Sequence, residues 1–136
     1  MANYYASCRS NYFKVKDEVQ FRNWIEDFDV EVITDEVNGE VLLGFISTEE
    51  FGTIPYIEED KDEGIMENRF LVEEISDYLK DGETVVIQEV GSEKMRFLNG
   101  YSIAIHSNGD FINLSLNEIY GMAMKKFGGN ITECRW

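Results

Sequence analysis

The sequence predicts an α+β fold: a mostly antiparallel sheet of about five to six strands with three helices. Three observations predict it. Apolar residues recur at helical spacing in three stretches, β-branched residues gather in short runs between them, and Asn-Gly pairs stand where tight turns would join neighbouring runs. The expected order is strand, helix, two strands, helix, three strands, helix, with the helices on one face of the sheet. The chain is expected to form a single domain, residues 1–136.

The N-terminal part is expected to form a strand and then a helix. Residues 1–10 are polar and are expected to fray or to pair late, whereas residues 11–16 alternate as a strand does. Asp17 is typical of an N-cap, and Gln20 three residues later would complete a capping box. The helix that follows has one apolar stripe, made of Phe21, Trp24, Ile25 and Phe28.

The central part contains one clear hairpin signal and one region without a clear pattern. Residues 30–34 and 41–46 are β-branched runs around Asn38-Gly39, which predicts a hairpin. Residues 48–66 show no period and are long for a structureless connection, which indicates a functional loop or an unrecognised element. A helix is expected over residues 66–80, with an apolar arc and an opposite acidic arc.

Phe70 lies on the acidic arc of this expected helix, together with Met66. One interpretation is that the preceding loop folds over both side chains, as is usual for large apolar residues. The other is that Phe70 is an apolar anchor for a partner, surrounded by carboxylates. The pattern leaves both interpretations open.

The C-terminal part is expected to contain three strands. Residues 84–90 form one run, and residues 95–105 continue as another. Asn99-Gly100 is either a second hairpin turn or a bulge or close backbone approach inside one long strand. The constant parity of the apolar positions on both sides favours one long strand. Asn108-Gly109 predicts a hairpin turn that leads to residues 111–114.

The last helix is expected to start at Ser115, with Glu118 as the partner in a capping box, and to end at Gly128. Its apolar positions predict a stripe buried against the core. The stripe consists of Leu116, Ile119, Tyr120, Ala123 and Phe127.

Charge is segregated along the chain. Residues 17–93 hold 24 of the 27 acids and only four bases, and the whole chain has a net charge of −15. This charge repels nucleic-acid phosphates and acidic membrane surfaces, so neither is an expected partner, whereas a basic protein surface would be attracted. The alternative is that the acids only keep the protein soluble. The residues expected to bind a partner are Glu58, Glu59, Asp60, Asp62, Glu63, Glu67, Phe70, Glu73, Glu74 and Asp77.

No constellation of residues predicts catalysis, a metal or a cofactor. The acidic run 58–63 does not fit the ligand spacing of an EF-hand loop, whether the loop starts at Glu58 or at Asp60. His106 is the single histidine, and a small enzyme would be favoured only if it shared a pocket with a cysteine or a carboxylate. Cys8 and Cys134 are expected to be free thiols in a reducing compartment. With no signal-like or membrane-length apolar run, the expected location is the cytoplasm of a bacterial host cell.

Two segments resemble a group of small acidic proteins carried by phages, plasmids and conjugative elements of Gram-positive bacteria. The first is Ser10-Asn11-Tyr12-Phe13-Lys14-Val15-Lys16-Asp17, followed by the helix with Phe21 and Trp24. The second is Glu89-Val90-Gly91-Ser92-Glu93-Lys94-Met95-Arg96-Phe97 with Gly100-Tyr101-Ser102-Ile103-Ala104-Ile105. The resemblance implies a mobile-element setting, in which anti-CRISPR and antirestriction proteins block host defence.

Charge and resemblance together predict a non-enzymatic inhibitor. It would mimic DNA and bind the basic nucleic-acid-binding surface of a host defence nuclease complex. The alternative is an interaction or regulatory module of a mobile element that binds a protein partner through its sheet face, with the acids only solvating. The oligomeric state is left open, a dimer included.

Overall fold

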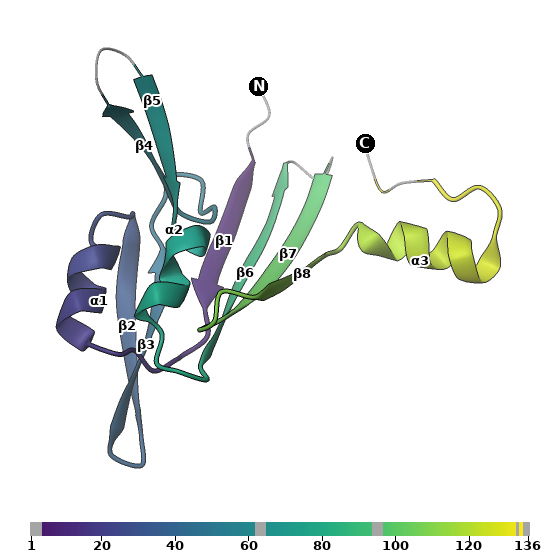
Figure 1. Ribbon diagram of the computed structural model, residues 1–136. Coiled ribbons are helices and arrows are strands. Elements are labelled where there is room, and N and C mark those ends of the chain that lie inside the picture. The colour runs from purple at the N-terminus through teal and green to yellow at the C-terminus, as the bar shows by residue number, and fades with distance from the viewer. Residues whose placement is uncertain (1–3, 62–64, 94–96, 133, 135–136) are drawn as a thin grey trace.

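The α+β class and the approximate order of elements are confirmed. The structure, a computed structural model, describes residues 4–61, 65–93, 97–132 and 134 (Figure 1). Six antiparallel strands form the main sheet in the order β2-β3-β1-β6-β7-β8, and β4 and β5 form a separate two-stranded sheet. The elements are β1 Tyr5–Ser10, α1 Glu18–Ile25, β2 Val30–Val37, β3 Glu40–Ser47, β4 Tyr56–Lys61, β5 Ile65–Phe70, α2 Leu71–Glu74, the 3-10 helix η1 Ile75–Tyr78, β6 Thr84–Glu93, β7 Phe97–His106, β8 Phe111–Ser115 and α3 Glu118–Phe127.

The expectation that residues 1–10 fray is wrong for β1, which lies inside the main sheet between β3 and β6. Its polar sequence conceals this position. Ser10 is buried, and its hydroxyl donates to the Asn11 carbonyl oxygen at 2.7 Å and accepts from the Phe45 N–H at 2.9 Å. The expected strand over residues 11–16 is reduced to isolated bridges, such as the one between Phe13 and Leu43.

The hairpin predicted at Asn38-Gly39 is confirmed. Asn38 and Gly39 have φ angles of 53° and 80°, and Val37 pairs with Glu40 across the turn. Two successive residues with positive φ give a turn whose twist matches that of the strands. The turn before β8 is confirmed as well, with Gly109 at a φ of 94°.

The expected helix over residues 66–80 is wrong in its first part. Residues 56–70 form the β4–β5 hairpin, in which Tyr56 pairs with Phe70, and helical structure begins only at Leu71. From there the apolar spacing is as predicted, because Leu71, Ile75 and Leu79 are all fully buried. The acidic run of β4 lacks the apolar alternation by which strands are recognised, and the hairpin was therefore missed.

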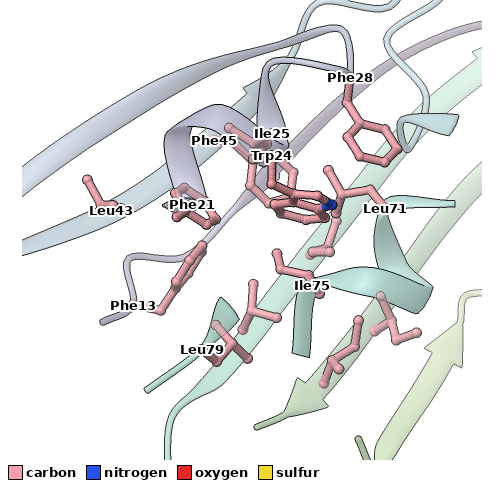
Figure 2. Close-up of a cluster of buried hydrophobic side chains, with 14 of the residues drawn as sticks. Phe13, Phe21, Trp24, Ile25, Phe28, Leu43, Phe45, Leu71, Ile75 and Leu79 are labelled. Atoms are coloured by element: carbon pink, nitrogen blue, oxygen red, sulfur yellow. The ribbon is translucent and has the colours of Figure 1, made fainter. Parts of the chain in front are cut away.

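The core lies between one face of the main sheet and the two helical segments α1 and α2–η1, as Figure 2 shows. Asp17 caps α1, accepting from the Gln20 N–H at 3.0 Å. The stripe predicted for α1 is confirmed, since all four of its members are buried. The aromatic rings of this stripe also contact η1, because Trp24 of α1 stacks on Tyr78 of η1 with ring centroids 4.4 Å apart. From the sheet, the core receives Leu43, Phe45, Val85, Ile87, Ile103 and Ile105.

β7 runs through Asn99-Gly100 without a turn, as the parity argument predicted. A Cβ atom at Gly100 would lie 2.6 Å from Cγ of Leu116, so the glycine permits a close approach of that side chain. The Leu116 N–H also donates to the Gly100 carbonyl oxygen at 2.8 Å. Gly100 is therefore the place where the chain that leaves β8 lies against β7.

Candidate partner-binding surfaces

Acidic residues gather on the half of the molecule built by α1, β2, β3, β4, β5, α2 and η1, called here the acidic half. Residues 17–77, which form it, hold 20 of the 27 acids, whereas residues 97–136 hold three acids and three bases. In Figure 1, α1 and β2–β5 lie together at the left, and β8 and α3 lie at the right. The charge segregation in the sequence is therefore also a segregation in space.

Ion pairs with the chain's own bases engage only part of these acids. Among the described residues, Lys14 pairs with Glu40, Arg22 with Glu18 at 3.6 Å, and Arg69 with Asp27 at 3.1 Å and Glu74 at 2.8 Å. Other acids of the acidic half have exposed side chains that are not in ion pairs within the described residues. They are Asp17, Glu26, Asp29, Glu31, Asp35, Glu36, Glu50, Glu58, Glu73 and Asp77.

The residues predicted to bind a partner divide into several groups. Glu58, Glu73 and Asp77 are exposed. In the β4–β5 hairpin, Glu59 pairs in register with Glu67, and Asp60 pairs with Met66. Two predicted residues, Asp62 and Glu63, lie outside the described residues. Because helical structure starts at Leu71, the predicted acids are shared between a hairpin and a short helix and do not line one helical arc.

Glu74 differs from the other predicted acids because it is held inside the fold. Its carboxylate accepts two hydrogen bonds from Arg69, at 2.8 and 3.1 Å, and one from Trp24 Nε1 at 3.0 Å. The Arg69 hydrogen bonds hold the pKa of Glu74 below its usual value, with a further contribution from Trp24. Arg69 also bonds Asp27 and lies over the Phe28 ring at 5.4 Å. These contacts join the hairpin to α1, so Glu74 is a structural residue.

Phe70 ends β5 and is 38% exposed, stacked on Tyr56, which is 45% exposed. The ring centroids are 5.9 Å apart with an interplanar angle of 24°. The two rings form a partly open aromatic pair at the base of the acidic hairpin. The preceding segment thus covers part of Phe70 through Tyr56, as the first interpretation expected, and the rest of the ring is open to solvent, as an apolar anchor would require.

A buried polar cluster around Glu89 was not predicted from the sequence. Glu89 accepts from Tyr4 Oη at 2.9 Å, from the Ile54 N–H at 2.8 Å and from Asn99 Nδ2 at 3.1 Å. It ties the N-terminal segment and the chain before β4 to the sheet. Burial raises the pKa of Tyr4, and burial followed by the Glu89 charge raises the pKa of Cys8 to about 12. The sequence does contain a sign of this burial: Val85, Ile87 and Glu89 alternate along β6, so Glu89 lies on the same face of the strand as the two core residues.

The geometry gives no support to catalysis by His106. Its Nδ1 accepts from the Asn108 N–H at 3.2 Å, which places the ring in the turn between β7 and β8. Cys8 is 3% exposed, and a thiol with so high a pKa is a poor nucleophile. Among the described residues, no group of three or more His, Cys, Asp and Glu side chains is arranged to hold a metal ion.

The prediction that the stripe of the last helix is buried is wrong: Leu116, Ile119 and Phe127 are exposed, and Tyr120 and Ala123 are only half-buried. α3 extends away from the sheet (Figure 1) and contains no buried residue. We call β8 and α3 together the C-terminal arm, residues 111–127. Its large apolar side chains that are more than half exposed are Phe111, Ile112, Leu114, Leu116, Ile119, Met122, Met124 and Phe127. The spacing of apolar residues shows where a helix has an apolar stripe, but it does not show which surface covers that stripe.

The sheet face opposite the core, called here the outer face, is not covered by a helix of the described chain. Val90 and Leu98 on this face are 64% and 47% exposed. Two shallow grooves of about 270 and 360 Å³ meet at Gln88 and Val90, the first reaching β8 and the second reaching β1 and β3. The outer face and the C-terminal arm are thus the main apolar surfaces found outside the core in the described residues.

None of the helices in the described ranges combines the length and apolar character needed to cross a lipid bilayer. Comparison of the chain with protein-family models, with curated proteins and with solved structures finds no match. Function is therefore inferred from the geometry of the acidic half, the outer face and the C-terminal arm.

Proposed function

We propose that this protein is a non-enzymatic inhibitor that binds the basic nucleic-acid-binding surface of a host defence nuclease complex, as a DNA mimic of the anti-CRISPR or antirestriction type. The observation that carries the proposal is the acidic half, where exposed carboxylates that form no ion pair within the described residues gather on one part of the fold. A dense, uncompensated field of one sign attracts a basic groove and accelerates association with it.

The binding surface would combine charge with an apolar anchor. Glu58, Glu73 and Asp77 present carboxylates to solvent. The stacked rings of Tyr56 and Phe70 lie close to Glu58, since Tyr56 is two residues before it in β4. The charges would raise the association rate and orient the two proteins, and the rings would add apolar area buried in the interface. Glu74 is assigned no direct role, because its carboxylate is already bonded to Arg69 and Trp24.

The first prediction concerns competition with DNA. The immobilised protein should capture nucleic-acid-binding proteins from a host lysate at about 0.05 M salt, and duplex DNA should displace them, because both ligands would occupy the same basic groove. The triple variant Glu58→Gln, Glu73→Gln, Asp77→Asn should bind about tenfold more weakly, since three exposed charge pairs contribute roughly 0.5 kcal/mol each. Affinity is measured for one purified captured protein.

The matched control neutralises three acids outside the acidic half: Asp81→Asn, Glu93→Gln and Asp110→Asn. It has the same net charge as the triple variant, and its affinity should stay within about twofold of the unmodified protein. If duplex DNA does not displace the captured protein, or if both triple variants weaken binding equally, the DNA-mimic proposal is wrong.

A second candidate function is an interaction or regulatory module that binds a protein partner through its sheet face. The exposed outer face, with Val90 and Leu98, is the observation that favours it. In that case the acids would only solvate the protein, and Val90→Lys would abolish partner binding while the acidic triple variant would not.

A further inference from the structure

Two complementary apolar surfaces stand exposed on the same chain. α3 presents Ile119 at 57% and Phe127 at 77% exposure, and the outer face presents Val90 at 64% and Leu98 at 47%. Isolated soluble domains rarely leave contiguous apolar patches larger than a few hundred Å² uncovered. A convex apolar helix and a hollowed apolar sheet face are the two sides of one ordinary helix-on-sheet contact.

The junction between β8 and α3 keeps the two surfaces apart within one chain. β8 ends at Ser115 and α3 begins at Glu118, so only two residues connect them. The first of these, Leu116, donates its N–H to the Gly100 carbonyl oxygen at 2.8 Å and places its side chain over that glycine. The Ser115 N–H in turn donates a hydrogen bond to the Glu118 carboxylate at 2.5 Å. These contacts direct α3 away from its own sheet (Figure 1).

The dimensions of the two surfaces agree. The ten residues of α3 span about 15 Å at 1.5 Å per residue. The grooves that meet at Gln88 and Val90 cross β1, β6 and β7 toward β8, and three strand spacings of about 4.8 Å give roughly 14 Å. One such helix would therefore cover the outer face from β1 to β8.

The charge distribution allows a second copy of the chain to be the occupant. Two molecules with a net charge of −15 repel each other, and the repulsion is weakest where the local charge is smallest. Residues 97–136, which include the whole C-terminal arm, carry three acids and three bases and so have no net charge. Two copies that approach through this end keep their acidic halves apart.

The exposed area is that of a stable interface. Phe111 pairs in register with the core residue Ile105 and so lies on the core side of the sheet, which leaves seven of the eight large apolar side chains of the C-terminal arm for this contact. Each of the seven is more than half exposed and would bury roughly 100 Å². Their sum is about 700 Å² per chain, close to the contribution of one partner to an interface of standard size.

From these observations we infer that the protein forms a symmetric homodimer in which α3 of each copy lies on the outer face of the other. The contact is isologous, because each chain supplies one helix and one groove. The inference concerns the neutral end of the molecule and does not depend on the function proposed for the acidic half. The dimer would present two acidic halves at opposite ends.

The second prediction tests this exchange of helices by light scattering coupled to size-exclusion chromatography at about 100 μM protein, above the micromolar range of weak interfaces of this size. The protein should have twice the 15.8 kDa mass of one chain. Ile119→Lys on the helix and Val90→Lys on the groove should each give monomers, because both side chains are exposed in one chain and buried in the dimer. An equimolar mixture of the two variants should recover dimers, since it restores one intact helix–groove contact.

The matched control is Gly121→Lys, which adds the same charge to the opposite side of α3, where a Cβ atom meets nothing within 4 Å. It should remain dimeric, and circular dichroism should show that all three variants are folded. Three results would each overturn the inference: a monomeric unmodified protein, a dimeric Val90→Lys variant, or a monomeric Gly121→Lys variant. A dimeric Val90→Lys variant combined with a monomeric Ile119→Lys variant would point instead to pairing of α3 with α3.

Discussion

Two neighbouring glutamates, Glu73 and Glu74, have different roles although the sequence gives them the same pattern. Glu73 is exposed, whereas Glu74 is bonded to Arg69 and Trp24. The difference follows from the turn made by α2, which directs one carboxylate toward the hairpin and the other toward solvent. A count of acids in a sequence therefore overestimates the number available to a partner.

The third prediction concerns Glu74→Gln. It should lower the free energy of unfolding at about pH 7 by roughly 1–2 kcal/mol, because hydrogen bonds to charged groups are lost and Arg69 remains without this partner. The pKa of Glu74 is lowered in the folded state, so its contribution is present above the unfolded value and is lost as pH falls through the folded value. The difference between the two proteins should therefore shrink below about pH 4.

Urea unfolding followed by fluorescence gives both measurements, and Trp24 reports the site directly because it donates to Glu74. The control Glu73→Gln should change stability by less than about 0.5 kcal/mol at either pH. Equal losses in the two variants at pH 7 would show that Glu74 has no structural role.

The fourth prediction distinguishes the two cysteines. Cys8 is buried and has a pKa raised to about 12, whereas Cys134 is exposed. At about pH 8 the thiolate fraction of Cys8 is roughly one in ten thousand, so an aromatic disulfide reagent should modify one thiol in the folded protein and two in urea. The variant Cys134→Ser should abolish the fast reaction and Cys8→Ala should leave it unchanged. Modification of both thiols at similar rates in the folded protein would contradict the buried position of Cys8.

At the scale of elements, the sequence was most informative where structure is decided locally. The Asn38-Gly39 turn needs only two residues that tolerate positive φ, and α1 needs only a cap and a stripe, so both were predicted correctly. The continuity of β7 was deduced from parity, which is also a local property.

Elements that depend on pairing partners were predicted less well. β1 is a polar segment that becomes a strand because β3 and β6 flank it, and β4 is an acidic segment that becomes a strand because β5 pairs with it. The apolar stripe of α3 was placed correctly in the sequence, but its burial was predicted wrongly, because no surface among the described residues buries it. For the candidate site, the acidic half follows from charge counts, whereas the roles of Glu74 and Glu89 required the fold.

At the scale of the whole molecule, the protein has an acidic half and a neutral apolar end. Like charges destabilise the compact acidic half, and this cost is lowered by the ion pairs of Arg69 and Lys14 without being removed. The neutral end differs: residues 97–136 carry no net charge, and the large apolar side chains of the C-terminal arm are exposed. Salt should therefore act differently on the two ends.

The fifth prediction uses this difference. Raising the NaCl concentration from about 0.05 to 0.5 M shortens the screening length to a few Å, so the Tm of the protein should rise by about 3–5 °C as self-repulsion decreases. The same change should weaken binding to a basic partner by orders of magnitude, because that attraction is screened too. Dimerisation through the C-terminal arm should be unchanged or slightly stronger, since residues 97–136 carry no net charge.

Calorimetry, affinity measurements and light scattering over one salt series separate these effects. The variant Glu58→Lys, Glu73→Lys reduces self-repulsion by reversing two exposed charges, and its Tm should be higher at low salt and respond less to added NaCl. A Tm that falls with salt would show that ion pairs outweigh repulsion in the acidic half, and no uncompensated field would then exist for a basic groove to recognise. A dimer that dissociates on addition of salt would show that charges hold its interface, which an apolar helix on an apolar sheet face does not allow.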